Sequence, residues 1–192
     1  MIEALLQAEA LVPGLLQDLQ NWRGILIDYE EPHVERLSAR MTLPGGPVTA
    51  FLHLIHPCAG RPFFHPHPWP SAVKIYRGVY KMDIGYSEPS PLIGFGTSPQ
   101  QVAALMAKAA EKAPPVAATV WLPAGSTYEM THRNGWHSVA PEGGPVLSLM
   151  VTGPAWERVA YSPGKGTTKA LSGPRMGELQ QVFLEIFSKS RG

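Results

Sequence analysis

The amino-acid sequence predicts a mainly β protein that folds as a single domain. The chain has 192 residues, of which 44% are hydrophobic and only 16% charged, and this composition suits one well-buried core. It contains 20 prolines and 19 glycines without an internal repeat, and such frequent interruptions are typical of many short strands joined by turns. We therefore expect one domain over residues 1–192, with a β core at about residues 24–160.

Three segments have helical patterns. Leucines recur at roughly helical spacing over residues 2–20 and are interrupted near Pro13, which predicts one or two short helices packed on the outside of the β core. An apolar stripe over residues 100–112, preceded by Ser98 as a capping residue, predicts an inserted helix. Apolar residues at helical spacing over residues 175–190 predict a C-terminal helix.

Segments with strand-like patterns fill most of the chain between these helices. Asn134 and Gly135 form the strongest hairpin signal, because both tolerate the positive φ of a tight turn. Gly78 marks a bend within one long segment, and residues 141–144 mark a turn between two others. Prolines exclude residues 57–70 from a helix or a central strand over most of that length. The predicted strands cover residues 24–29, 36–43, 48–56, 72–86, 117–122, 126–132, 136–140 and 146–152.

The balance of charges excludes several classes of partner. The formal net charge is +1, and no basic stripe is available to follow a phosphate backbone or an anionic membrane. No uninterrupted apolar stretch is long enough to cross a bilayer, and residues 1–20 do not resemble a signal peptide. The single cysteine, Cys58, cannot form an internal disulfide. We therefore expect a cytoplasmic protein that binds neither nucleic acid nor a membrane.

The segment from Phe64 to Pro70 carries the strongest functional signal, because it contains two histidines two residues apart. In an extended chain, His65 and His67 project from the same face with Cα atoms about 6–7 Å apart, close enough for both imidazoles to bind one metal ion. The flanking prolines reduce the entropy lost when this segment becomes ordered. An isolated pair of this kind also occurs in solvated surface turns, so the surrounding pattern decides between the two interpretations.

That surrounding pattern resembles the cupin superfamily. The first cupin motif has a glycine, His-x-His, a glutamate and a second glycine, and the frame kept here to within one residue is Gly60, His65, His67, Ser71 and Gly78. The second motif is a Pro-x-Gly turn followed by a strand with another histidine, and residues 123–140 are similar to it. The resemblance spans about residues 48–152. It implies a double-stranded β-helix, or jelly-roll barrel, that holds one divalent metal ion per chain.

Two departures from the cupin motifs change the ligand set that the resemblance implies. Ser71 stands where the family usually has a glutamate ligand, so a three-histidine site remains, similar to that of the thiol dioxygenases in this superfamily. Tyr128 stands at the strict spacing of the third histidine, so that ligand must come from further along the chain. We favour His137, which begins a His-x-Val segment of the family type. His132, beside the predicted hairpin turn, is the alternative.

Other side chains near the motifs are weaker candidates. Glu129 could complete a triad of two histidines and one carboxylate, but it faces outward if Tyr128 and Met130 face inward. Tyr76 and Tyr128 are candidate catalytic residues that could orient a substrate, although aromatic residues in a barrel are more often part of the core.

Four further residues have simple structural interpretations. His53 and His56 are expected to be core or edge histidines that each make one hydrogen bond. Cys58 is expected to be a small buried side chain. Lys74 could bind an anionic ligand, although lysines on strands are usually solvated.

A three-histidine site suits oxidative chemistry on a small molecule. Three neutral imidazoles leave the charge of the metal uncompensated and leave up to three positions of an octahedral ion open. We expect Fe(II), with Zn, Ni and Mn as alternatives, because imidazole accepts several of these metals. The predicted function is that of a non-haem iron enzyme of the dioxygenase type that binds its small-molecule substrate inside the barrel. A metal-dependent isomerase or lyase and a non-catalytic binding protein stay open as alternatives, and the apolar terminal segments suggest a homodimer.

Overall fold

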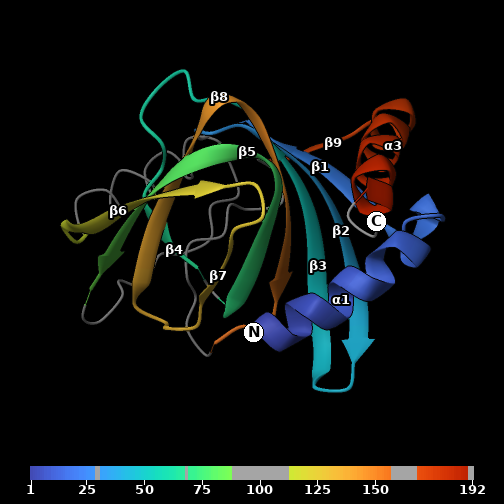
Figure 1. The fold of residues 1–192 in the computed structure, drawn as a ribbon, viewed down its shortest axis with the longest axis horizontal. Coiled ribbons are helices and arrows are strands. Elements are labelled where there is room, and N and C mark those ends of the chain that lie inside the picture. The colour runs from blue at the N-terminus through green and yellow to red at the C-terminus, as the bar shows by residue number, and fades with distance from the viewer. Residues whose placement is uncertain (29–30, 68, 88–112, 157–167, 190–192) are drawn as a thin grey trace.

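Long antiparallel strands dominate the computed structural model, which describes residues 1–28, 31–67, 69–87, 113–156 and 168–189. The strands form one sheet in the order β6-β5-β8-β3-β2-β1-β9, with β4 paired to β8 and β7 paired to β5 (Figure 1). Their bounds are β1 Arg23–Ile27, β2 Val34–Leu43, β3 Gly46–Ile55, β4 His65–Pro66, β5 Ser71–Tyr86, β6 Val116–Pro123, β7 Thr127–Met130, β8 Gly135–Thr152 and β9 Lys169–Ala170. The prediction of a mainly β fold is confirmed.

The sheet bends sharply along β5 and β8, and the bend gives the molecule two layers. Residues 71–75 of β5 pair with residues 148–152 of β8, whereas residues 79–86 pair with residues 135–142. Between these stretches the register shifts, and Gly78 adopts a φ of +84° that a residue with a side chain rarely adopts. The result is a cupin-like β-sandwich, as the sequence resemblance implies, and the predicted bend at Gly78 lies where the layers meet.

One prediction about turns is wrong, and a second holds for the turn but not for the pairing of its strands. Residues 141–144 do not separate two strands, because they lie within the continuous strand β8, where Gly143 and Gly144 have positive φ values and widen the bulge opposite Gly78. Residues 132–135 do form a turn, closed by a hydrogen bond of 3.0 Å from the Gly135 amide to the His132 carbonyl. The flanking strands β7 and β8 both pair with β5 instead of forming a hairpin with each other. Cross-strand pairing in the sandwich therefore outweighs the local turn signal.

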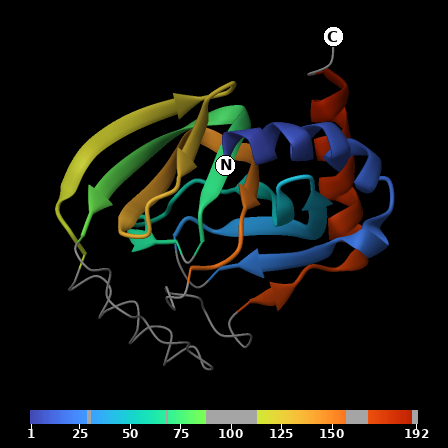
Figure 2. The same ribbon diagram turned by 90° about the horizontal axis from the view of Figure 1, so that it is seen from below.

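Helices cover the outer face of the sheet at the end formed by β1, β2 and β3 (Figures 1 and 2). Helix α1 (Ile2–Leu15) continues through Pro13 and is followed by the short 3₁₀ helix η1 (Leu19–Asn21). Helix α3 (Gly173–Lys189) confirms the predicted C-terminal helix. Buried residues on these helices include Leu5, Val12, Leu179 and Phe183, which pack with Leu37, Leu52 and Leu149 of the sheet. The inserted helix predicted over residues 100–112 lies outside the described residues.

Within the described part of the chain, no helix has both the length and the apolar character needed to span a bilayer.

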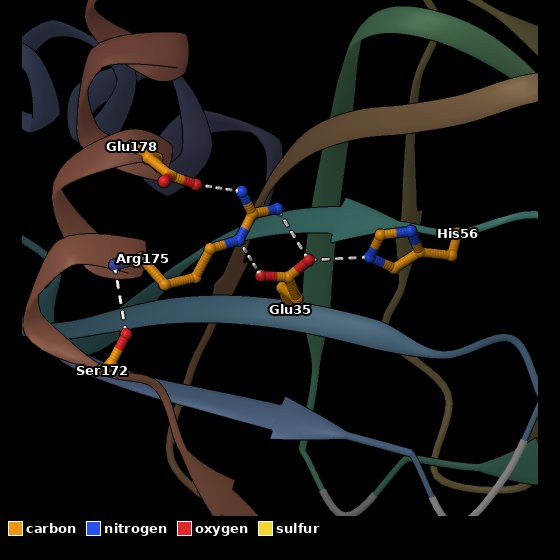
Figure 3. Close-up of polar contacts among 5 residues, drawn as sticks. All are labelled: Glu35, His56, Ser172, Arg175 and Glu178. Atoms are coloured by element: carbon orange, nitrogen blue, oxygen red, sulfur yellow. Dashed lines mark hydrogen bonds and ion pairs between the residues drawn. The ribbon is translucent and has the colours of Figure 1, made fainter.

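A polar cluster ties α3 to β2 (Figure 3). Arg175 donates two hydrogen bonds to the Glu35 carboxylate, of 2.6 Å from Nε and 2.9 Å from Nη2, and it also pairs with Glu178. His56 Nε2 lies 2.9 Å from the same carboxylate of Glu35. The hydrogen bonds from Arg175, opposed by burial, hold the pKa of Glu35 below its ordinary value, and those bonds also raise the pKa of Arg175. Glu35 is therefore an ionised, almost buried anchor for the C-terminal helix.

Candidate metal centre

Three histidines from two separate stretches of the chain meet inside the sandwich. His65 lies on β4, His67 follows two residues later, and His137 lies on β8. Strand β4 pairs with the start of β8 so that His65 and His137 are direct register partners. One nitrogen of each of the three rings lies within 4.8 Å of the others, and the Nε2 atoms of His67 and His137 are 2.8 Å apart. The structure thus brings together the three residues favoured from the sequence.

Hydrogen bonds on the far side of two of these rings direct Nε2 toward the centre of the cluster. Nδ1 of His65 is 3.0 Å from the Phe63 carbonyl oxygen, which can only accept, so Nδ1 carries the proton and Nε2 keeps a lone pair. Nδ1 of His67 is 3.3 Å from the Ser71 hydroxyl, which can accept in the same way. Ser71, at the position where the cupin motif usually has a glutamate, thus contacts one of the three clustered histidines. Nδ1 of His137 is buried without a hydrogen-bond partner among the described residues.

Burial keeps all three imidazoles uncharged. It lowers the pKa of His67 to about 3, with a smaller contribution from His65. The pKa of His65 is also lowered by burial, against the opposing hydrogen bond to Phe63. Burial, followed by the charges of His67 and His65, holds the pKa of His137 well below its usual value. Neutral imidazole is the form that binds a metal ion.

The 2.8 Å distance between Nε2 of His67 and Nε2 of His137 limits what can lie between the two rings. Two uncharged Nε2 atoms that both present lone pairs repel each other at 2.8 Å unless a proton or a cation lies between them. A neutral His137 with its proton on Nε2 makes this contact a hydrogen bond, whereas with its proton on Nδ1 the nitrogen atoms of His65, His67 and His137 form a donor set that fits a cation. Three nitrogen donors suit Zn, Fe, Ni or Cu better than Ca or Mg, which prefer oxygen.

A cavity of about 330 Å³ adjoins the three histidines, between the two layers of the sandwich. This volume lies in the usual range for sites that bind small molecules. The walls are mainly apolar, and Tyr80 and Tyr128 also line them. The Tyr80 hydroxyl donates a hydrogen bond of 2.6 Å to the Tyr128 hydroxyl. Burial, partly offset by that bond, raises the pKa of Tyr128 to about 12, so this phenol stays protonated.

Of the two tyrosines predicted to be catalytic, the structure places only Tyr128 beside the site. The position expected for Tyr76 is corrected: its hydroxyl donates a hydrogen bond of 2.9 Å to Glu9 of α1, and its ring packs on Phe187 of α3. Burial and the neighbouring Glu9 raise the pKa of Tyr76 far above its usual value. Tyr76 therefore belongs to the outer layer and not to the cavity.

The alternative ligands also lie away from the cluster. His132 is exposed at the turn before β8, where its Nε2 accepts or donates a hydrogen bond with the Tyr86 hydroxyl at 2.9 Å. Glu129 points outward, as the alternation with Tyr128 implied, and pairs at 3.1 Å with the amino group of Met1. Neither side chain is among the groups that converge on His67.

Of the four residues given a simple structural interpretation, three lie outside the cavity and His53 lines it. His56 makes the hydrogen bond to Glu35 described above, and Lys74 pairs at 2.6 Å with Glu9 of α1 instead of facing a ligand. Cys58 is half-buried, and burial raises the pKa of its thiol. His53, interpreted from the sequence as a core or edge residue, lines the cavity instead.

Comparisons with known proteins reveal similarity only to solved structures. No protein-family model matches the chain, and no curated protein matches it either. The hydroxypropylphosphonic acid epoxidase from S. wedmorenis is 13% identical, with 68% of this chain and 55% of that chain covered and a TM-score of 0.44. A cupin protein from Bacteroides fragilis is 15% identical, covering 60% and 72%, at a TM-score of 0.35. The EutQ protein of Clostridium difficile is 9% identical, covering 66% and 72%, at a TM-score of 0.38. The chain spans only about half the length of the epoxidase, and similarity at this level identifies no substrate.

Proposed function

We propose that this cupin-like β-sandwich is a metal-dependent enzyme, a non-haem iron oxidoreductase of the dioxygenase type that acts on a small molecule in its cavity. One observation carries the proposal: three uncharged imidazoles, from His65, His67 and His137, converge at the wall of a cavity large enough for a substrate. A purely structural role offers no reason to bury three such side chains with their nitrogen atoms facing one another.

In this proposal, His65, His67 and His137 hold one divalent ion through nitrogen atoms that face the cavity. Iron(II) bound there supplies the one-electron and dioxygen chemistry that protein side chains lack. The chain itself supplies the remaining parts of the site. Ser71 and the Phe63 carbonyl fix the rings of His67 and His65, because each holds the Nδ1 atom on the far side of the ring.

Tyr128 is the polar side chain that we assign to substrate orientation. Its hydroxyl oxygen accepts the hydrogen bond from the Tyr80 hydroxyl, so its own O–H can donate to a substrate oxygen in the cavity. The raised pKa of Tyr128 keeps that hydrogen in place across the physiological pH range. The apolar walls around the two tyrosines exclude water from the substrate.

Metal analysis tests the proposal directly. Protein purified without a histidine tag should contain about one iron per chain, and each of the variants His65→Ala, His67→Ala and His137→Ala should lose it. His132→Ala is the matched control, because this histidine is exposed and outside the cluster, and it should keep full metal. Loss of metal in His132→Ala with retention in His137→Ala would overturn the ligand assignment.

Oxygen consumption separates the proposed reaction class from its alternatives. Iron-loaded protein should consume dioxygen when small organic substrates are added, and the His67→Ala variant should not. Protein that holds zinc, nickel or manganese and consumes no oxygen would favour the isomerase or lyase alternative. Protein that binds small molecules without any metal would favour a non-catalytic binding protein and contradict the proposal.

We also propose a cytoplasmic location and a homodimer. The single thiol of Cys58 is compatible with a reducing compartment. Sedimentation of the purified protein would test the dimer, and it would be rejected if only the monomer mass of 20.9 kDa were found.

A further inference from the structure

A row of three polar residues crosses the inner face of the sandwich, separate from the three clustered histidines. Arg36 on β2 is the register partner of His53 on β3, and His53 is in turn the register partner of Ser148 on β8. All three residues line the cavity. Because register partners on one face of a sheet project side by side, these side chains form a continuous polar row across three neighbouring strands.

The residues on either side of this row are mostly apolar. Two residues away along the strands, Val34 and Ile55 line the cavity on one side of the row, and Ser38 and Met150 line it on the other. Three polar side chains in one row are unusual on an inner face, because burying polar groups costs free energy unless they have partners. The buried hydroxyl of Ser148, which has no hydrogen-bond partner among the described residues, is the member of the row that core packing does not explain.

Each member of the row offers a donor to a ligand. Ser148 is 1% exposed, and its hydroxyl has no hydrogen-bond partner among the described residues. Arg36 carries a permanent positive charge, and its guanidinium carbon lies 4.7 Å from the centre of the Phe51 ring. His53 is uncharged, because burial and, to a smaller extent, the charge of Arg36 lower its pKa to about 3. A neutral His53 can donate one ring N–H to an anion.

The row and the three histidines line the same cavity of about 330 Å³, a volume in the usual range for small-molecule sites. The Phe51 ring beneath Arg36 stacks on Trp69 at a centroid distance of 6.4 Å, and Trp69 lies 6.4 Å from the ring of His67. His53 also stacks on Phe51, at 5.9 Å. Aromatic surfaces therefore connect the row to the candidate metal centre, and they suit a flat or apolar ligand body.

We propose that the polar row of Arg36, His53 and Ser148 binds the carboxylate of an organic acid, whose apolar body lies along the aromatic wall toward the clustered histidines. A carboxylate matches the planar fork of an arginine and can accept further hydrogen bonds from a hydroxyl and an imidazole N–H. The statement that this acid is the substrate rests on the proposed function, whereas the carboxylate site itself does not.

Paired probes that differ only in charge test the carboxylate site. Benzoate and benzamide have nearly the same shape, and titration calorimetry of each into the full chain measures their affinities. We expect benzoate to bind about tenfold or more tightly than benzamide, because hydrogen bonds to a charged group are the stronger ones. Repeating the titrations after dialysis against a chelator removes direct coordination of benzoate to a metal as an explanation, and the preference should persist.

Two arginines on the same strand provide a matched comparison. Arg36→Met keeps most of the side-chain length and should abolish the preference for benzoate. Arg40→Met should preserve it, because Arg40 is exposed at the far end of β2 and does not line the cavity. Arg36→Lys should retain only part of the preference, since lysine lacks the planar fork. If Arg36→Met does not fold, as judged by circular dichroism, Arg36→Lys and Ser148→Ala decide, and both should weaken benzoate binding several-fold.

The outcomes of the titrations and of the metal analysis are independent. Equal affinity for the two probes, no binding of benzoate in the millimolar range, or a preference that Arg36→Lys and Ser148→Ala leave unchanged would each overturn the carboxylate site. Protein that prefers benzoate through Arg36 but never holds a metal would support this site and overturn the proposed function. Iron-loaded protein that does not prefer benzoate over benzamide would support the proposed function and overturn the carboxylate site.

Discussion

At the scale of single residues, the three clustered histidines differ in how their rings are held. A backbone carbonyl fixes His65, a hydroxyl contacts His67, and Nδ1 of His137 has no partner among the described residues. Side chains that hold a ligand from its far side influence metal affinity without contacting the metal. Ser71 is the one such side chain that can be removed by substitution, because the partner of His65 is a main-chain atom.

Replacement of Ser71 by alanine should weaken metal binding about tenfold. The hydroxyl that lies 3.3 Å from Nδ1 of His67 is lost, so the ring is no longer held with Nε2 toward the cluster. Competition with a chromogenic chelator measures the affinity. Ser188→Ala is a suitable control, because its hydroxyl bonds only to the backbone of α3, and equal affinities in the two variants would contradict the prediction.

The sequence identified the clustered histidines but could not place the tyrosines of β5. His-x-His spacing and a third histidine on a later strand are visible in one dimension, because they depend on motif spacing. Tyr76 and Tyr80 are four residues apart, which predicts the same face for both. The bulge around Gly78 changes the alternation, so Tyr76 faces α3 while Tyr80 faces the cavity.

The polar row of Arg36, His53 and Ser148 could not be predicted from the sequence either. Arg36, His53 and Ser148 are far apart in the sequence, and each alone is compatible with an ordinary strand position. Only the register of β2, β3 and β8 brings them side by side. No local signal specifies that register, since it depends on which strands become neighbours in the folded sheet.

At the scale of secondary-structure elements, the bend shared by β5 and β8 determines the two-layered shape. A Cβ atom at Gly78 would lie 2.8 Å from the Pro145 carbonyl oxygen and 2.9 Å from a methyl group of Val146. The positive φ at this position adds backbone strain for any other residue.

The substitution Gly78→Ala should lower the free energy of unfolding by about 2 kcal/mol or more, because both steric clash and backbone strain act against it. Urea denaturation followed by tryptophan fluorescence measures the change. Gly45→Ala provides the comparison: a Cβ atom there meets nothing within 4 Å, and its φ is not in the left-handed region. A Gly78→Ala protein as stable as Gly45→Ala would show that the bend tolerates a side chain.

The contact between α3 and β2 should depend on pH through Glu35. Its pKa in the folded protein is lowered from 4.5, so its ion pair stabilises the fold above about pH 4.5 and this contribution is lost as the pH falls through the lower folded-state value. Glu35→Gln removes the charge at every pH. The variant should therefore be less stable than wild type by about 1–3 kcal/mol at pH 7, with a smaller difference in acid.

Urea denaturation of both proteins at neutral and acidic pH tests this expectation. Glu178→Gln serves as the control, because that carboxylate is 62% exposed and should contribute little. A difference between wild type and Glu35→Gln that is constant or grows as the pH falls would contradict the assignment.

Helices were easier to predict than the extent of the strands. The terminal helices α1 and α3 each bury a single apolar stripe, and such a stripe is visible in the sequence. Strand β8 was divided in two by the glycines of residues 141–144, because a bulge and a turn require the same residues. Whether such glycines form a bulge or a turn depends on whether the neighbouring strand continues alongside, and here β5 does.

At the scale of the whole molecule, an ion at the clustered histidines would connect the proline-rich segment around β4 with β8. An ion that binds only the folded chain raises the free energy of unfolding. The increase grows with the logarithm of the ratio of free ion concentration to dissociation constant. At a hundredfold excess over that constant the gain is about 2.7 kcal/mol.

Removal of metal by a chelator should therefore lower the melting temperature of wild-type protein, and restoring the ion should recover it. His137→Ala should melt at the same temperature with and without the ion. Differential scanning calorimetry at fixed protein concentration provides the measurement. A wild-type transition that does not respond to chelation would contradict a bound ion that stabilises the fold.

Strand β8 contributes two polar side chains to the cavity wall, His137 before its glycine bulge and Ser148 after it. The spacing between the two groups is consequently a property of the main chain, fixed by how β8 curves at Gly143 and Gly144. For a ligand that contacts both groups, this spacing would set the length that the site accepts. Reshaping that curve would change the length of molecule accepted while every contacting side chain kept its identity.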